Sequence, residues 1–107
     1  MQITVGATDA GAVELVVEGE LDMATSGRLR AAADAALRED ARHLVLDLAG
    51  VSFIDSTGVG ALVAIRNLAM DRETALTLRD PSRPARRILE LSTLVEVFTV
   101  ETSGPSA

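Results

Sequence analysis

The stretch Phe53-Ile54-Asp55-Ser56-Thr57-Gly58-Val59-Gly60 decides the fold of this chain, because an apolar strand pattern ends in it and a helical pattern begins. The first backbone N–H groups of a helix lack partners within the helix, and Ser, Thr or Asp side chains, or an anion, satisfy them well. The stretch therefore predicts a helix start with reachable hydroxyls, and its glycines leave room for another backbone or an enzyme active site. An ordinary N-cap with no further role is the simpler interpretation of the same residues.

A hydroxyl at such a helix start can carry a phosphate without destroying the helix. The phosphate adds a charge of about −1.5 to −2, which lies against the positive end of the helix dipole and is tolerated there. The docking surface for a partner would change, although the fold would survive.

The beginning of the chain predicts a β-hairpin. Residues 3–7 and 12–18 are short runs rich in β-branched residues, and residues 8–11 supply the Asp and Gly of a turn. Residues 19–22 are expected to end the second strand.

A helix and a buried strand come next. Residues 25–39 have apolar positions at helical spacing, and Asp22 or Thr25 can cap this helix. Residues 43–48 are nearly all apolar, which is typical of a central strand buried on both faces. Residues 49–55 are predicted to be the connection to the next helix.

The helix after the quoted stretch, over residues 57–72, is apolar nearly all around in its first half. A helix covered on one side only should show a single apolar stripe. The surplus is therefore a candidate partner surface, because exposed apolar patches usually mark contacts. The alternative is that small residues such as Ala61 and Ala64 line the outer face.

The last third of the chain predicts a fourth strand over residues 75–78 and a helix that begins at Ser82 or Pro84. An edge strand over residues 96–100 and a flexible polar tail over about residues 101–107 complete the chain.

The residues of this last predicted helix suggest one buried stripe and one basic cluster. The expected buried stripe consists of Ile88, Leu91 and Leu94 or Val95. Its arginines, Arg83, Arg86 and Arg87, are either a surface for a phosphate or an acidic partner, or a solvated helix face.

These elements predict a single α/β domain over residues 1–107. The opening hairpin and the alternating helices and strands imply a mixed sheet of about five strands with three main helices and right-handed crossovers. Ser56 is then expected at the carboxyl end of the third strand, where open α/β sheets usually place their sites.

Composition excludes several classes of function. The net charge of −6 disfavours nucleic acid and anionic membrane as main partners, and two Phe with no Trp or Tyr leave no stacking platform for single strands. The chain has no Cys and no Lys, so it can hold neither a disulfide nor a Walker-type phosphate loop. No basic leader and no apolar run of about 18 residues is visible, which indicates a cytoplasmic protein.

The titratable residues offer little catalytic chemistry. His43 is the only histidine and is expected to be structural. An acid cluster for a divalent metal can be drawn from Glu20, Asp22, Asp47 and Asp55. An acidic chain places carboxylates at loop ends in any case, so we expect no metal, no cofactor and no enzymatic activity.

Two motifs resemble those of the STAS domain family of bacterial anti-sigma factor antagonists. The run Asp55-Ser56-Thr57-Gly58-Val59-Gly60 is similar to the phosphorylation-site signature of that family. The run Gly19-Glu20-Leu21-Asp22, followed by Thr25, is similar to its N-terminal motif. The resemblance covers almost the whole chain.

The resemblance implies a regulatory switch. The unphosphorylated protein would bind an anti-sigma factor with a GHKL-type serine kinase fold and free the sigma factor. Phosphorylation of Ser56 would end the binding, a PP2C-type phosphatase would reverse it, and Thr57 would be the helix cap. The residues implied in partner binding are Asp22, Thr25, Phe53, Ile54, Asp55, Ser56, Thr57, Gly58, Val59, Gly60, Leu62 and Val63.

Two other functions stay open. The first is a constitutive STAS subunit of a membrane transport or scaffold assembly, without phosphorylation. The second is a small enzyme or nucleotide-binding protein, supported only by the acid cluster and the glycines.

Overall fold

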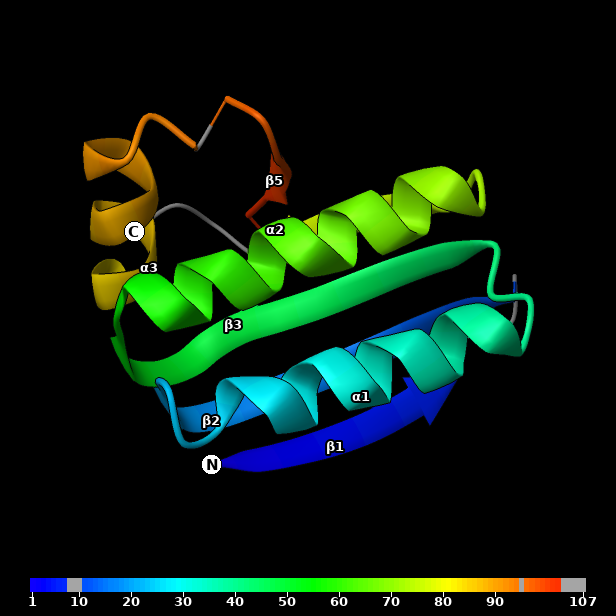
Figure 1. Cartoon of the computed structure of the whole chain (residues 1–107), viewed down its shortest axis with the longest axis horizontal. Coiled ribbons are helices and arrows are strands. Elements are labelled where there is room, and N and C mark those ends of the chain that lie inside the picture. The colour runs from blue at the N-terminus through cyan, green and yellow to red at the C-terminus, as the bar shows by residue number, and fades with distance from the viewer. Residues whose placement is uncertain (8–10, 95, 103–107) are drawn as a thin grey trace.

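Figure 1 shows the computed structural model of the chain, which describes residues 1–7, 11–94 and 96–102. Its elements are β1 (Gln2–Ala7), β2 (Ala12–Leu21), α1 (Ser26–Arg38), β3 (His43–Ile54), α2 (Ser56–Asp71), β4 (Ala75–Arg79), α3 (Arg83–Leu91) and β5 (Thr99–Glu101). The predicted hairpin turn, apart from Gly11, and the predicted tail from residue 103 onward lie outside the described residues.

The strands form one mixed sheet in the order β1-β2-β3-β4-β5. β1 is antiparallel to β2, and the other three pairs are parallel. Parallel neighbours need a crossover connection, which α1, α2 and α3 provide in turn. The predicted α/β class, the central third strand and the edge position of the last strand are confirmed.

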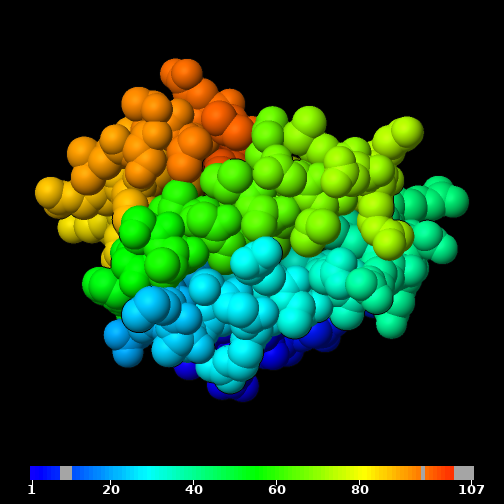
Figure 2. All heavy atoms as spheres, viewed as in Figure 1, coloured from blue at the N-terminus to red at the C-terminus, as the bar shows by residue number. Residues whose placement is uncertain are grey.

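One face of the sheet packs against the helices. Leu44, Leu46 and Leu48 alternate along β3, are fully buried, and share one apolar cluster with Leu29 of α1 and Leu62 of α2. In Figure 1, α1 and α2 lie side by side over the sheet, and in Figure 2 their atoms hide most of the strands. Each leucine buried in this way contributes about 1.5–3 kcal/mol, so this layer is the main source of stability.

The opposite face of the sheet is polar. Arg79 of β4 forms an ion pair with Glu14 of β2, and His43 Nε2 lies 2.7 Å from Thr77 Oγ1. Val45 lies in register between Glu14 and Thr77 and is only 3% exposed. Polar side chains therefore cover Val45, and His43 has the structural role predicted for it.

The predicted connection over residues 49–55 is wrong, because β3 continues to Ile54. The pairing of β2 with β3 shifts register twice, and at the second shift Gly19 has a φ of 106°, which a side chain would disfavour. Buried residues in this part of β3 recur at Leu48, Val51 and Ile54, at every third position. The two-residue period that identifies a strand is therefore absent from the sequence here.

α3 begins where predicted but buries a different face. Ser82 is the N-cap, and its Oγ accepts a hydrogen bond from the Ala85 N–H at 3.3 Å. Ala85 and Leu89 are fully buried, whereas Leu91 is 75% exposed, so its predicted burial is wrong. Two residues beyond Leu89 correspond to a rotation of about 200° around the helix axis. Among the other residues predicted for this stripe, Ile88 and Leu94 are half-buried. Val95 lies outside the described residues.

The last strand is shorter than predicted and starts later. The Val97 N–H donates to the Leu94 carbonyl at 3.0 Å, which closes a turn instead of extending a strand. Phe98 then inserts into the apolar cluster at 7% exposure, and pairing with β4 begins only at Thr99.

Candidate functional site

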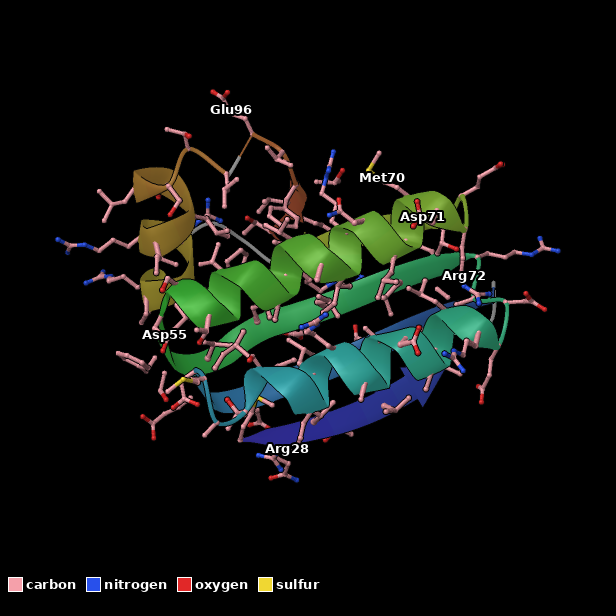
Figure 3. All side chains as sticks on the ribbon, viewed as in Figure 1. Arg28, Asp55, Met70, Asp71, Arg72 and Glu96 are labelled. Atoms are coloured by element: carbon pink, nitrogen blue, oxygen red, sulfur yellow. The ribbon has the colours of Figure 1, made fainter. Side chains whose placement is uncertain are left out.

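The two motifs meet at one corner of the molecule. β2 ends at Leu21, within the residues 19–22 predicted to end it, and Leu21 pairs in register with Ile54 at the end of β3. The Asp55 N–H then donates to the Leu21 carbonyl at 3.3 Å. Figure 3 shows Asp55 where β3 passes into α2, next to the loop that leads from β2 to α1. Parallel pairing thus brings together segments that are more than 30 residues apart.

Asp55 caps α2. Its Oδ1 accepts hydrogen bonds from the Gly58 N–H at 3.0 Å and from the Thr57 hydroxyl at 2.6 Å. The Thr57 hydroxyl and the Gly58 N–H hold the pKa of the Asp55 carboxyl below its ordinary value. The prediction that Thr57 is the cap is therefore wrong: α2 starts at Ser56, and Thr57 donates to the cap.

Ser56 is the first residue of α2 and is exposed. Within the described part of the chain, its hydroxyl has no hydrogen-bond partner, whereas the neighbouring Thr57 hydroxyl is engaged by Asp55. Of the two hydroxyls in the motif, only that of Ser56 makes no hydrogen bond within the described residues.

The two glycines of the motif have different roles. A Cβ on Gly58 would lie 2.5 Å from the Leu21 carbonyl oxygen and 2.9 Å from Ile54 Cγ1. The start of α2 can therefore sit against the ends of β2 and β3 only if this residue has no side chain. Gly60 is exposed, and a Cβ there would meet nothing within 4 Å.

The loop from β2 to α1 is fixed by Asp22 and Thr25. Asp22 Oδ1 accepts from the Ala24 N–H at 3.0 Å, and Thr25 Oγ1 accepts from the Asp22 N–H at 2.9 Å. The Thr25 hydroxyl also lies 2.7 Å from the Glu20 carbonyl, to which it donates. Thr25 occupies the N-cap position of α1 as predicted, but its side chain makes no cap hydrogen bond, because it bonds back to the loop.

Comparison with known proteins identifies the family. The family model described as STAS domain matches residues 6–107. This chain belongs to the STAS domain family. An anti-sigma F factor antagonist of Paenibacillus polymyxa is 30% identical over 91 residues, covering 84% of this chain and 78% of that protein. An anti-sigma-B factor antagonist of Listeria monocytogenes is 29% identical over 104 residues, covering 94% of this chain and 91% of that protein.

A solved structure agrees with the fold of this STAS domain. The crystal structure of an anti-sigma factor antagonist from Mycobacterium paratuberculosis superposes with a TM-score of 0.83 at 31% identity. The match covers 94% of this chain and 84% of that one.

Two large apolar side chains project from the corner of this STAS domain. Met23, at the tip of the loop from β2 to α1, is 80% exposed, and Phe53, near the end of β3, is 48% exposed. Phe53 pairs in register with Glu20, and the Met23 N–H contributes to the lowered pKa of Asp55, so both flank the start of α2. Exposed apolar side chains beside polar groups are typical of protein contacts.

The residues predicted to bind a partner separate into exposed and buried sets. Leu62 is fully buried, so the expectation that it faces a partner is wrong, and the apolar surplus of α2 is used largely by the core. Exposed or half-buried are Asp22, Thr25, Phe53, Asp55, Ser56, Thr57, Gly60 and Val63; buried are Ile54, Gly58, Val59 and Leu62.

Sequence reasoning missed Met23. A single methionine after a strand gives no periodic signal, and its exposure depends on how Asp22 and Thr25 close the loop. The signal available in the sequence was an Asp and a Thr three residues apart, because such side chains bond to the backbone of a tight turn and leave the residues between them at its tip.

The acid cluster does not form a metal site. Among the described residues, no group of three or more acids, histidines or cysteines is close enough to hold an ion. Asp47 lies away from the corner, on the polar face, where its Oδ1 accepts from the Ala49 N–H at 3.0 Å. In the same part of the chain, no helix is both long and apolar enough to cross a bilayer.

Proposed function

We propose that this STAS domain is an anti-sigma factor antagonist controlled by phosphorylation of Ser56. The unphosphorylated form binds an anti-sigma factor, which releases its sigma factor, and the phosphorylated form does not bind. The place of action is the cytoplasm, where transcription occurs. Catalysis belongs to the partner, and the STAS domain is its substrate and ligand.

One observation carries the proposal: Ser56 is an exposed hydroxyl at the first position of α2 with no hydrogen bond of its own in the described chain. Thr57 offers no equivalent group, because its hydroxyl donates to Asp55. The names of the Paenibacillus and Listeria relatives support the class of partner.

The switch follows from the surroundings of Ser56. A phosphate there carries about −1.5 to −2 charges and follows the Asp55 carboxylate directly in the chain, at the corner that also exposes the apolar side chains of Met23 and Phe53. Inside a contact, that charge would be desolvated and would repel acidic groups of the partner, so binding weakens. The helix itself tolerates the charge at its positive end.

The proposed kinase is the anti-sigma factor itself, with a GHKL-type fold, and the proposed opposing enzyme is a PP2C-type phosphatase. A kinase must bring ATP to the Ser56 hydroxyl, and the exposed Gly60, one turn further along α2, adds no side chain to that approach. The proposal includes no cofactor, nucleic acid or membrane as a direct partner.

The test uses four forms of the chain as bait in lysate of the source organism: wild type, Ser56→Ala, Ser56→Asp and Thr57→Val. We expect wild type, Ser56→Ala and Thr57→Val to retain a GHKL-type kinase, identified by mass spectrometry, and Ser56→Asp to lose it. The purified kinase should then transfer radiolabelled phosphate from ATP to wild type and Thr57→Val but not to Ser56→Ala.

Two results would contradict the proposal. If the kinase phosphorylated Ser56→Ala at Thr57, the phosphate acceptor would be Thr57 and not Ser56. Equal retention of transport or scaffold subunits by wild type and Ser56→Asp, with no kinase, would favour a constitutive STAS subunit.

A further inference from the structure

α3 presents a basic face to solvent. Arg83, Arg86, Arg87, Glu90 and Leu91 follow one another at three- and four-residue spacing, which places them on one side of the helix. The buried residues of α3 lie on its other side, against the apolar cluster. The same five residues line a shallow hollow of about 300 Å³.

The guanidinium groups of this basic face have no partners within the described part of the chain. The side chains of Arg83, Arg86 and Arg87 form no hydrogen bond or ion pair there, unlike that of Arg38, which pairs with Asp34 at 3.0 Å. The chain has a net charge of −6, so its own acids outnumber its bases, and three adjacent unpaired arginines are unexpected. They repel one another, and a ligand with negative charge would relieve that repulsion.

Leu91 adds an apolar contact at the end of the basic face. It is 75% exposed. A bare anion would gain nothing from Leu91. A peptide that carries both carboxylates and an apolar side chain would contact the three arginines and Leu91 together, while its carboxylates would stay away from Glu90.

We infer that the basic face of α3 docks an acidic segment of a protein partner. Carboxylates of that segment pair with Arg83, Arg86 and Arg87, and one apolar side chain covers Leu91. Charge complementarity favours a protein segment over nucleic acid or anionic membrane. A nucleic acid or a membrane extends beyond the basic face and is repelled by the net negative charge of the rest of the domain. A short acidic segment stays within about one Debye length, 8 Å, of the arginines.

The basic face lies at the same end of the molecule as Ser56, but none of its residues belongs to the corner formed by the two motifs. The inference does not rest on phosphorylation. Figure 1 shows α3 at the end of the molecule where α2 begins, with its axis crossing that of α2. α3 is connected to this end through the Ser82 N–H, which donates to the Leu48 carbonyl of β3 at 3.1 Å.

The test is titration of the whole isotope-labelled chain with a short end-capped peptide in which Glu recurs at three- and four-residue spacing with one Leu. We expect changes in the NMR chemical shifts of residues 83–91, and we expect the binding affinity to fall as the salt concentration rises. The double variant Arg83→Glu/Arg87→Glu should bind about tenfold or more weakly. Leu91→Ser should weaken binding while leaving its salt dependence unchanged.

A matched control is Arg30→Glu/Arg42→Glu. These two arginines are exposed, their side chains have no partners in the described chain, and the variant has the same net charge as the first. It should bind like wild type. If the first variant unfolds, Arg83→Gln/Arg87→Gln takes its place.

Absence of peptide binding would overturn the inference. Equal weakening in both double variants, or shift changes away from α3, would do the same, because they indicate unspecific attraction. Binding to a DNA duplex or to phosphatidylglycerol vesicles, with none to the peptide, would assign the basic face to a different ligand.

Discussion

At the scale of the residue, Asp55 connects the parts of the site. Its carboxylate holds the Thr57 hydroxyl and the Gly58 N–H, and its backbone N–H is bonded to the end of β2. The pKa of Asp55 is lowered because these donors stabilise the charged form. A lowered pKa in the folded state means that the ionised carboxylate stabilises the fold.

The first prediction is that Asp55→Ala lowers the midpoint of thermal unfolding at neutral pH and that this difference shrinks in acid. The stabilisation is complete above the ordinary Asp pKa of about 3.9 and is lost as the pH falls through the lower pKa of the folded state. Thermal unfolding of both proteins across that range measures it. Glu96→Ala, which removes an exposed carboxylate from a loop, controls for net charge. A difference that stays constant down to the lowest pH would contradict the role of the charge.

The second prediction is that Ser56→Asp leaves the fold intact. A negative charge in the first turn of a helix is favourable by about 0.3–1 kcal/mol, and repulsion from Asp55 opposes it, so we expect a net change below about 1 kcal/mol. Urea unfolding of wild type and variant measures this free energy. A loss of several kcal/mol would mean that any lost binding of this variant reflects unfolding instead of a local switch.

At the scale of the element, α2 is positioned by one glycine and left accessible by another. Gly58→Ala would force a Cβ against the Leu21 carbonyl oxygen, and such overpacking costs about 1–3 kcal/mol. That cost exceeds the helix-propensity gain of up to about 1 kcal/mol. At Gly60 the space is open, so only the gain applies.

The third prediction follows: Gly58→Ala destabilises the protein, whereas Gly60→Ala stabilises it by about 0.5–1 kcal/mol. Chemical unfolding of both variants tests the pair. Gly60→Ala should also weaken retention of the proposed kinase despite its higher stability. Equal effects of both substitutions on stability would show that α2 does not pack against β2 as closely as described.

At the scale of the whole molecule, the sheet has one apolar and one polar face. Leu78 and Arg79 are neighbours in β4 but point to opposite faces: Leu78 is fully buried, and Arg79 pairs with Glu14 and Glu101. Successive side chains of a strand point to opposite faces of the sheet, so two neighbours in sequence can lie in an apolar and in a polar environment.

The fourth prediction compares these neighbours. Leu78→Ala should lower the free energy of unfolding by about 2–5 kcal/mol, because it leaves a cavity in the apolar cluster. Arg79→Ala should cost about 0.2–1 kcal/mol for each partly exposed ion pair, and less at high salt. Urea unfolding at low and high salt separates the two. A larger loss from Arg79→Ala would mean that the polar face, and not the helical layer, holds the sheet together.

Local pattern was sufficient for most of the elements. The leucines of β3 and the apolar spacing of α1 depend on residues close in sequence, so the class, the order of elements and the central strand followed directly. The extension of β3 to Ile54 did not, because two register shifts remove the two-residue period. Leu91 was misplaced because the direction of the core relative to a nine-residue helix is a tertiary property.

The sequence by itself determined that Asp55, Ser56 and the glycines stand at a helix start, because capping is a matter of neighbouring residues. Only the tertiary structure decided that Asp55 caps and Ser56 stays free, that Met23 and Phe53 flank them, and that Leu62 is buried. The physical reason is that exposure and pairing depend on parallel strands and packed helices, whose contacts join residues far apart in the chain.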